Sequence, residues 1–242
     1  MIKFFRKIRY NLMEQNKTGK YFKYAIGEIL LVIIGILIAV SINGWNEERK
    51  LKIEEQAILK DLKQEMETNL EALEIVIEEH EKSFEAAKEM RALFGNRDAF
   101  NKMPDSTYAS IFRKMNNNYT YDPRNGILNS IISSGQVNII SNKELKYLMA
   151  SLKEWTVDAF ENTMKIENQR DDLLNSTYHN NYIFKDGKID GWNWKASYDH
   201  PPFRTLASIL FFFTRRDGLI EEYELKEALK HIIELLENDI EK

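Results

Sequence analysis

The chain has 242 residues, of which 43% are hydrophobic and 30% charged, and its formal net charge is -4. This length allows one domain with a core of ordinary size beside a membrane anchor. The charge is uneven: residues 1–24 hold seven basic residues and one acidic residue, whereas residues 46–242 hold 27 basic and 36 acidic residues. The bulk of the chain therefore lacks the basic surface that nucleic-acid binding requires, and we expect no nucleic-acid partner.

Residues 1–23 form a basic segment that we place in the cytoplasm or at the membrane interface. Apolar and basic residues alternate through residues 1–16. At helical spacing they give an apolar stripe with cationic edges, typical of a helix that lies in the interface. The alternative is a flexible segment whose charge only sets orientation. Inner-membrane lipids with anionic headgroups are the expected partners in both cases.

Residues 24–45 are predicted to form a transmembrane helix. The stretch from Ile29 to Trp45 has no formal charge, and with its flanks it is long enough to cross about 30 Å of hydrocarbon. A cleavable signal peptide is the alternative, but its apolar run has only about 7–15 residues. Cleavage after Ser41 would also remove the whole basic segment. We therefore expect a bacterial inner-membrane anchor with a cytoplasmic N-terminus and residues 46–242 in the periplasm.

Two features of this apolar helix concern contacts inside the membrane. Gly27, Gly35, Ala39 and Asn43 recur on one line of the helix, and small residues let helices pack closely, which indicates a packing face for self-association. Glu28 is a carboxylate within the membrane helix. It either has a function, such as proton coupling or pairing with a cation, or lies near the cytoplasmic edge and reaches the headgroups.

A second long helix pattern follows the apolar run. Residues 46–94 contain no proline or glycine, and apolar residues recur every three or four positions. This predicts an amphipathic helix of about 70 Å that either continues from the membrane helix or hinges at Gly44. Its charged face is expected to be solvated, and its spacing permits a coiled-coil seam. A break at residues 95–104 and short helices at 106–115 and 127–132 are expected next.

The second half of the chain contains one more long helix. Ser141–Glu144 is a capping box that opens a helix reaching about residue 179, which we expect to pack antiparallel against the first long helix. Asp186-Gly187 lies between β-prone runs and predicts a hairpin. Two separate helices are predicted at 203–214 and from 219 to about 240. The expected fold is all-α: a transmembrane helix, then a periplasmic helical bundle built on two long antiparallel helices, with a small β-hairpin or loop insertion.

No catalytic, metal-binding or cofactor-binding motif is found in the sequence. The histidines are His80, His179, His200 and His231. None lies in the two-histidine motif of zinc proteases, and none follows a glutamate by three residues as in di-iron bundles. We expect His80 and His231 to lie in surface pairs with helix neighbours. The sequence predicts no catalytic residue, no metal site and no cofactor.

Aromatic residues form the richest candidate for binding. The group consists of Trp155, Trp192, Trp194 and Tyr198, with Tyr119 and Tyr121. If these side chains converge, they line a pocket for a peptide, a sugar or a small apolar ligand. The alternative, which we favour, is that they clamp loops onto the helical core.

Three stretches resemble a known family: MIKFFRKIR, YAIGEILLVIIGILIAVSINGWNE and SSGQVNIISNKELK, beginning at residues 1, 24 and 133. They resemble uncharacterised single-span membrane proteins of Bacteroidota with a helical periplasmic region. The resemblance implies the inner membrane of a Gram-negative cell, and that Glu28 and Asn43–Asn46 belong to the family pattern. It implies no activity, so no catalytic residue is transferred.

The leading functional hypothesis is a binding or scaffold module that senses or assembles something. Because the first 24 residues are too short for an output domain, a signal would pass through a membrane or periplasmic protein partner, or through a homo-oligomer. A second hypothesis is an accessory or stator-like subunit of an ion-coupled membrane complex that uses Glu28. A third is a hydrolase with an unrecognised site.

Overall fold

The computed structural model of the protein describes most of the chain and divides it into two units. The described residues are 6, 10, 18–178, 182–193, 196 and 199–240. The units are Met1–Gln56 and Ala57–Lys242. The structure is helical, with two short strands in the second unit. Apart from Arg6 and Tyr10, the predicted interfacial helix of residues 1–16 lies outside the described residues.

The first described helix, α2, covers Thr18–Phe94 and has 77 residues. It has no break at Gly44 and ends before Gly95, so the predicted continuation and end of this helix are confirmed. From Ile29 to Ile42 the large apolar side chains are each between 46% and 64% exposed. Among the described residues, α2 is the one helix long and apolar enough to cross a membrane. A signal sequence near the N-terminus passes the same test of length and composition.

The described part of the second unit continues with shorter and longer elements after α2. These are α3 (Arg97–Lys102), α4 (Asp105–Met115), α5 (Gly126–Ser134), η1 (Gln136–Asn138), α6 (Lys143–Tyr178), β1 (Tyr182–Lys185), β2 (Lys188–Trp192), α7 (Pro201–Ala207), the π-helix η3 (Ser208–Thr214) and α8 (Arg215–Ile240). The helix α3 forms where a break was expected, and Asn96 caps it. Gly135 ends α5 in the left-handed conformation, with φ of 78°, as the pattern Ser-Ser-Gly predicts.

The helix α6 begins one residue later than the capping-box pattern indicates. The backbone N–H of Leu145 donates to Oδ1 of Asn142 at 3.1 Å, so Asn142 is the N-cap. The Nδ2 group of the same side chain donates to Asp239 Oδ2 at 2.7 Å, which ties the start of α6 to the end of α8.

The prediction of two separate helices at the C-terminus is wrong, because α7, η3 and α8 follow one another without a break. Gly218 lies inside α8 rather than at a helix end. A Cβ atom at this position would lie 3.1 Å from Cβ of Asn162 on α6. Glycine is thus explained by the close approach of two helices, and not by a turn.

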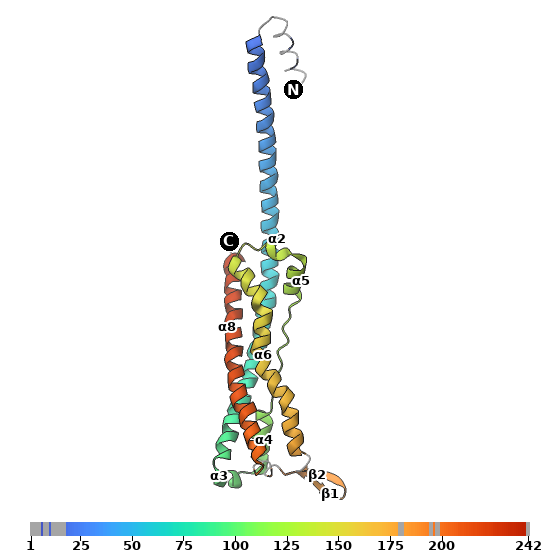
Figure 1. Ribbon diagram of the computed structural model, residues 1–242, viewed down its shortest axis with the longest axis vertical. Coiled ribbons are helices and arrows are strands. Elements are labelled where there is room, and N and C mark those ends of the chain that lie inside the picture. The colour runs from blue at the N-terminus through green and yellow to red at the C-terminus, as the bar shows by residue number, and fades with distance from the viewer. Residues whose placement is uncertain are drawn as a thin grey trace. The chain divides into compact units, whose positions relative to one another are not determined.

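The polar contacts of α8 give the directions of the long helices, seen side by side in Figure 1. Between α2 and α8 they are Lys63–Glu237 and Glu74–Lys226, both at 2.8 Å. Between α6 and α8 they are Glu144–His231 and Asn162–Glu221, both at 2.9 Å. Both α2 and α6 are therefore antiparallel to α8 and parallel to each other. The predicted antiparallel packing of the two long helices is wrong.

The connector between α4 and α5 explains this direction. Ser83 Oγ donates to the carbonyl of Met115 at 2.8 Å, and Asn69 bonds Arg124. Residues 115 and 124 are thus held beside Ser83 and Asn69 of α2, which are 14 residues apart, or about 21 Å along the helix. Nine residues cover that distance only in an extended form, since their limit is about 30 Å. The connector brings the chain back to the start of the second unit, where α6 begins.

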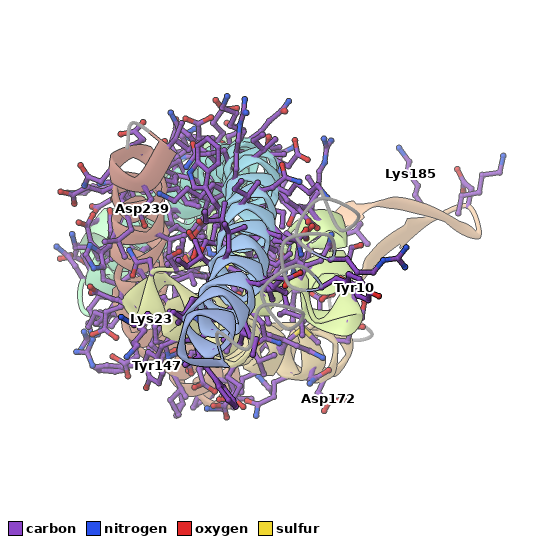
Figure 2. The ribbon with its side chains drawn as sticks, turned by 90° about the horizontal axis from the view of Figure 1, so that it is seen from above. Tyr10, Lys23, Tyr147, Asp172, Lys185 and Asp239 are labelled. Carbon is purple, nitrogen blue, oxygen red and sulfur yellow. The ribbon has the colours of Figure 1, made fainter. Side chains whose placement is uncertain are left out.

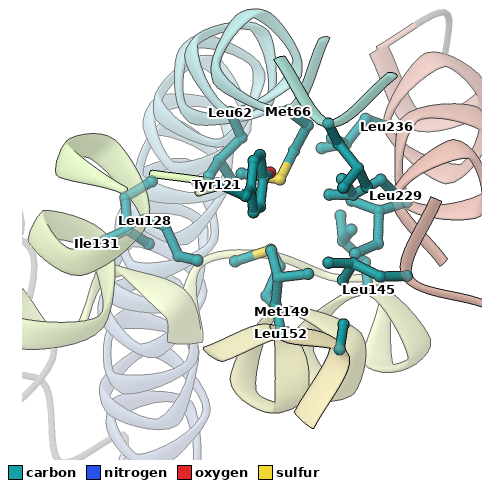
Figure 3. Packing of buried hydrophobic residues seen from close by; sticks show 14 of the residues in the cluster. Leu62, Met66, Tyr121, Leu128, Ile131, Leu145, Met149, Leu152, Leu229 and Leu236 are labelled. Atoms are coloured by element: carbon teal, nitrogen blue, oxygen red, sulfur yellow. The ribbon is translucent and has the colours of Figure 1, made fainter. Parts of the chain in front are cut away.

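The core of the second unit consists of two apolar clusters. The first is formed by α2 up to Ile77 together with α5, α6 and α8. Figure 3 shows side chains of these helices converging, among them Leu62, Leu145 and Leu229. The second cluster begins on α2 at Ala86 and includes aromatic residues of α3, α4, α7 and η3. On α2, the buried residues between Ile77 and Ala86 are the polar His80 and Ser83.

The strands β1 and β2 pair antiparallel around Asp186 and Gly187, where the sequence predicts a two-residue turn. Both turn residues have positive φ, 51° and 74°, which is the conformation of a type I′ turn. Figure 2 shows this hairpin, marked by Lys185, standing out from the helices of the second unit.

The pair of His231 and Glu144 predicts a pH dependence of stability. Nε2 lies 2.9 Å from Glu144 Oε1, and this hydrogen bond raises the pKa of His231 above its ordinary value of 6.5. Because the pKa is raised in the folded state, the stabilisation is complete below the unfolded pKa and is lost as pH rises through the folded one. We expect the melting temperature to fall between about pH 6 and pH 8, and His231→Gln to reduce that slope. Circular dichroism melts of both proteins across this pH range test the prediction. Lys230→Gln is the control and should keep the slope of the natural chain. An unchanged slope in His231→Gln would contradict the prediction.

Candidate functional site

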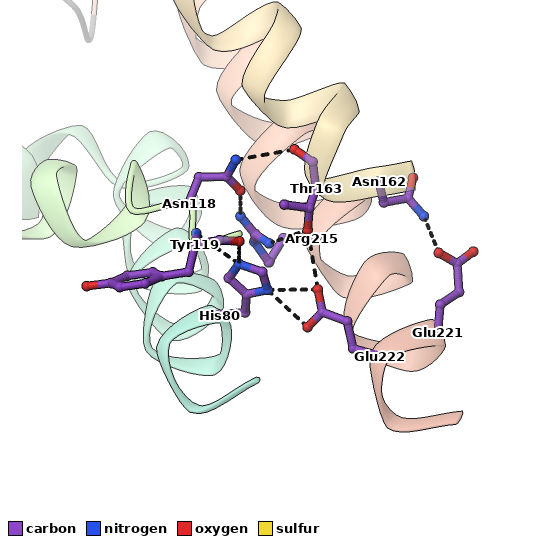
Figure 4. Close-up of polar contacts among 8 residues, drawn as sticks. All are labelled: His80, Asn118, Tyr119, Asn162, Thr163, Arg215, Glu221 and Glu222. Atoms are coloured by element: carbon purple, nitrogen blue, oxygen red, sulfur yellow. Dashed lines mark hydrogen bonds and ion pairs between the residues drawn. The ribbon is translucent and has the colours of Figure 1, made fainter. Parts of the chain in front are cut away.

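A layer of buried polar side chains separates the two apolar clusters. It consists of the buried residues His80 on α2, Thr163 on α6, and Arg215 and Glu222 on α8, with the partly buried Asn118 on the connector, and is called the buried polar layer below (Figure 4). His80, Arg215 and Glu222 have no exposed surface, and Thr163 is 1% exposed. Ionisable groups are rarely buried so completely without partners, so the contacts of each decide what the layer does.

His80 joins three segments of the chain. Its Nδ1 lies 2.8 and 3.0 Å from the two carboxylate oxygens of Glu222, so Nδ1 carries a proton and donates it. Its Nε2 lies 3.1 Å from the backbone nitrogen of Tyr119 and 3.0 Å from the carbonyl oxygen. A neutral ring accepts from the N–H group, and a charged ring donates to the carbonyl. The ring therefore has a partner in both protonation states.

Arg215 provides the positive charge of the layer. Its Nη1 donates to Oγ1 of Thr163 at 3.3 Å, and its Nη2 donates to Oδ1 of Asn118. Burial lowers the pKa of Arg215 to about 10, while the charge of Glu222 acts in the opposite direction. Nε is buried and has no hydrogen-bond partner among the described residues. Leaving one such donor unpaired costs about 1–3 kcal/mol.

Thr163 connects the two charges, because its hydroxyl lies 3.3 Å from both Arg215 Nη1 and Glu222 Oε1. With a neutral His80, the layer holds one positive and one negative charge and is neutral overall. In the described structure Nε2 of His80, the nitrogen that would activate a nucleophile, faces the backbone of Tyr119 instead of a hydroxyl group. The geometry thus fits a group that holds three helices and the connector in register.

Two other polar residues of α2, Asn69 and Glu65, bind the connector and α5. Asn69 accepts from the N–H of Arg124 and donates to its carbonyl, both at 2.8 Å, as a paired backbone would. Glu65, 7% exposed, accepts from the first amides of α5, Ile127 at 2.7 Å and Leu128 at 2.9 Å. A carboxylate at a helix N-terminus also stabilises the helix dipole. An extended segment that lies against a helix has no neighbouring strand to bond its backbone N–H and C=O groups. These side chains of α2 supply such hydrogen bonds.

The sequence reasoning missed these residues and wrongly placed His80 at the surface. The buried positions of α2 alternate by three and four residues: Leu59, Leu62, Met66, Asn69, Leu73, Val76, His80, Ser83, Ala87 and Met90. Polar residues at such positions are the signal that could have found them, since this spacing defines a buried helix face. Glu65 lies beside this face and was assigned to the solvated side. His231 does lie at the surface, 46% exposed at its side chain.

The predicted packing face and aromatic group have the following places. Gly27, Gly35, Ala39 and Asn43 are exposed on α2, and Glu28 is half-buried. Trp155 packs partly against the first apolar cluster. Trp192 belongs to β2, which follows the end of α6, and Trp194 and Tyr198 lie outside the described residues. The convergence of these aromatic side chains into a pocket stays a prediction.

Comparison with known proteins shows the family. The model of DUF6090, a family of unknown function, matches residues 28–185. The chain belongs to this family. The DUF6090 region contains Glu28 and three residues of the buried polar layer, His80, Asn118 and Thr163. No curated protein and no solved structure matches the chain. The expected bacterial phylum and the inner-membrane topology stay predictions.

Proposed function

We propose that this DUF6090 protein is a membrane-anchored helical module that binds other proteins, as a scaffold or sensor, without catalysis of its own. Residues 24–45 cross the bacterial inner membrane, residues 1–23 lie in the cytoplasm, and residues 46–242 form a periplasmic helical bundle. The observation that carries this proposal is the composition of α2. One end is an apolar run with no buried side chain, and the other supplies a buried face to a folded core.

Exposed apolar side chains on the C-terminal helices support protein binding. Leu206, Ile209, Phe213, Ile220 and Tyr223 recur at helical spacing on α7, η3 and α8, and are 38–54% exposed; we call them the C-terminal stripe. Apolar groups gathered on an exposed face typically mark interaction sites. The buried polar layer supports the absence of catalysis, because its groups are engaged with one another and with the backbone.

Membrane anchoring is tested by placing charges in the apolar run. Each arginine at the centre of a membrane helix costs about 2.5–3.5 kcal/mol of insertion, so Ile34→Arg with Ile38→Arg should remove the protein from carbonate-washed membranes. The matched control is Leu51→Arg with Ile53→Arg on the same helix, which should stay bound. A reporter fused after Lys242 should be periplasmic. A mature chain that begins after Ser41 would contradict the anchor.

Protein binding is tested by photo-crosslinking in cells. A photoreactive amino acid at Ile220 in the C-terminal stripe should give a discrete cross-linked product. The photoreactive amino acid placed instead at Glu227, which is exposed two turns further along α8, should give no cross-linked product. Absence of a discrete product at all five stripe positions would contradict a constant protein partner at this surface.

The second candidate function is an accessory or stator-like subunit of an ion-coupled complex, favoured by Glu28 within the apolar helix. Glu28→Gln should then abolish the cellular phenotype while expression and membrane retention stay normal. A fully active Glu28→Gln protein would remove this candidate.

A further inference from the structure

A groove of ≈ 400 Å³ lies between α6 and α8. Its lining consists of Trp155, Asp158 and Ala159 from α6, and Glu221, Glu224, Leu225 and Ala228 from α8. The groove exists because Ala159 and Ala228 are too small to fill the space between the helices. Natural ligand sites span about 300–1,000 Å³, so the volume is sufficient for one side chain or small ligand.

The groove combines an apolar floor with uncompensated negative charge. Its floor is formed by Ala159 and Leu225, which are buried. Its three carboxylates are Asp158, Glu221 and Glu224, and no basic residue lines it. Among the residues that the structure describes, neither Asp158 nor Glu224 has an ion-pair partner.

The environment of Glu221 shows that the negative charge is poorly balanced. Burial raises the pKa of Glu221, and the charges of Glu161 and Asp217 act in the same direction, against a hydrogen bond from Asn162. Lys165 is close enough to lower this pKa, but it forms an ion pair with Glu161 at 3.0 Å. A cation in the groove would therefore relieve repulsion between acidic groups.

Two other grooves in the second unit differ in charge. In the groove between α2 and α8, Arg216 pairs with Asp217 and Glu85 pairs with Lys88, both at 2.7 Å. The acidic surface of α2 around Glu78 and Glu79 contains Lys82, which lies 2.8 Å from both carboxylates. In both places the chain itself supplies the balancing cation, so charge complementarity points to the groove between α6 and α8.

We propose that the groove between α6 and α8 binds a lysine or arginine side chain of a protein partner. The aliphatic stem of such a side chain packs on Ala159, Leu225 and Ala228. Its cationic end lies beside the carboxylates and the ring of Trp155, which attracts cations through its π-face. This assignment rests on the proposed function of protein binding, and it names the chemistry of the partner.

A metal ion is a poorer fit to the same carboxylates. In the described part of the chain, no three histidine, aspartate or glutamate side chains come close enough to share one. A long organic cation, in contrast, uses both the apolar floor and the separated charges. The groove is therefore matched to a side chain with a stem of several methylene groups.

Isothermal titration calorimetry on the full chain in non-ionic detergent tests the proposal. The probe is a five-residue peptide with one central arginine between glycine and serine; the same peptide with neutral citrulline is its control. We expect saturable one-to-one binding of the arginine peptide below about 1 mM and none of the citrulline peptide. Asp158→Asn with Glu224→Gln should weaken binding about tenfold, and Trp155→Leu about fivefold.

The matched control is Glu227→Gln with Glu234→Gln, which removes the same charge from exposed positions of α8 outside the groove. It should leave the affinity within about twofold. Equal weakening by both double variants would overturn the proposal, because general charge attraction would then explain binding. Tighter binding of spermidine than of the peptide would also overturn it. If the arginine peptide does not bind while membrane retention and cross-linking at the C-terminal stripe are normal, only the groove proposal is refuted. If membrane retention and cross-linking fail, the proposed function is refuted.

Discussion

Glu222→Ala is expected to lower the free energy of unfolding by about 3–5 kcal/mol, because it leaves Arg215 buried without a negative charge and His80 without its acceptor. Both oxygens of Glu222 contact His80 Nδ1, and one also contacts Thr163. Urea unfolding of the full chain in detergent, followed by circular dichroism, measures this loss. A change below about 1 kcal/mol would contradict the assignment of this carboxylate to the register of the helices.

Two comparisons separate the loss of charge balance from other effects. Glu227→Ala removes an exposed carboxylate from the same helix and should cost less than about 0.5 kcal/mol. Replacing His80, Arg215 and Glu222 together by leucine removes all three ionisable groups, and should recover much of the stability lost in Glu222→Ala. If the triple variant is as stable as the natural chain but no longer folds to one state, the layer acts in specificity more than in stability.

Tyr121→Ala is expected to cost about 3–5 kcal/mol, because it removes the main anchor of the connector. The ring is 9% exposed and stacks on Phe160 of α6, with centroids 5.3 Å apart. Its hydroxyl donates to the carbonyl of Asn69 at 3.2 Å, and burial raises the pKa of Tyr121. Loss of the ring frees the segment that brings the chain back along α2. Urea unfolding of the full chain measures the cost.

Two control variants accompany this prediction, one at Tyr121 itself and one at Tyr119. Tyr121→Phe keeps the stacked ring and loses one hydrogen bond, so it should cost about 0.5–1.5 kcal/mol. Tyr119→Ala removes a ring that is 41% exposed and points away from the buried polar layer in Figure 4, and should cost less than about 1 kcal/mol. Equal costs for Tyr119→Ala and Tyr121→Ala would contradict an anchoring role.

Local patterns were sufficient to predict where most helices lie. The absence of proline and glycine predicted the long helix that ends at Phe94, and the pattern Ser-Ser-Gly predicted the end of α5 at Gly135. These signals act within a few residues, through backbone conformation and capping. The same local reasoning failed around Gly218, which lies between the two helices predicted at 203–214 and from 219 to about 240 but is inside α8. Glycine is required at this position by the close approach of Asn162, which is 56 residues earlier in the chain.

The candidate site could be predicted only in part, because burial depends on what packs against each face. Trp155 was selected as an aromatic residue, but the carboxylates beside it, Asp158 on α6 and Glu221 and Glu224 on α8, were not selected. His80 was assigned to the surface because no motif accompanies it. Its partners, Tyr119 and Glu222, are 39 and 142 residues away in the chain. No local pattern relates groups at such distances.

By itself, the sequence determined the helical class of this protein, its apolar N-terminal helix and most of its helix ends, because these depend on neighbouring residues and on the length of an apolar run. The tertiary structure alone decided that α6 runs parallel to α2, that polar residues of α2 bind an extended connector, and that a layer with opposite charges separates two apolar clusters. The physical reason is that the direction of a helix depends on the path of the chain between helices. The burial of a polar side chain, likewise, depends on a hydrogen-bond partner that a distant segment supplies.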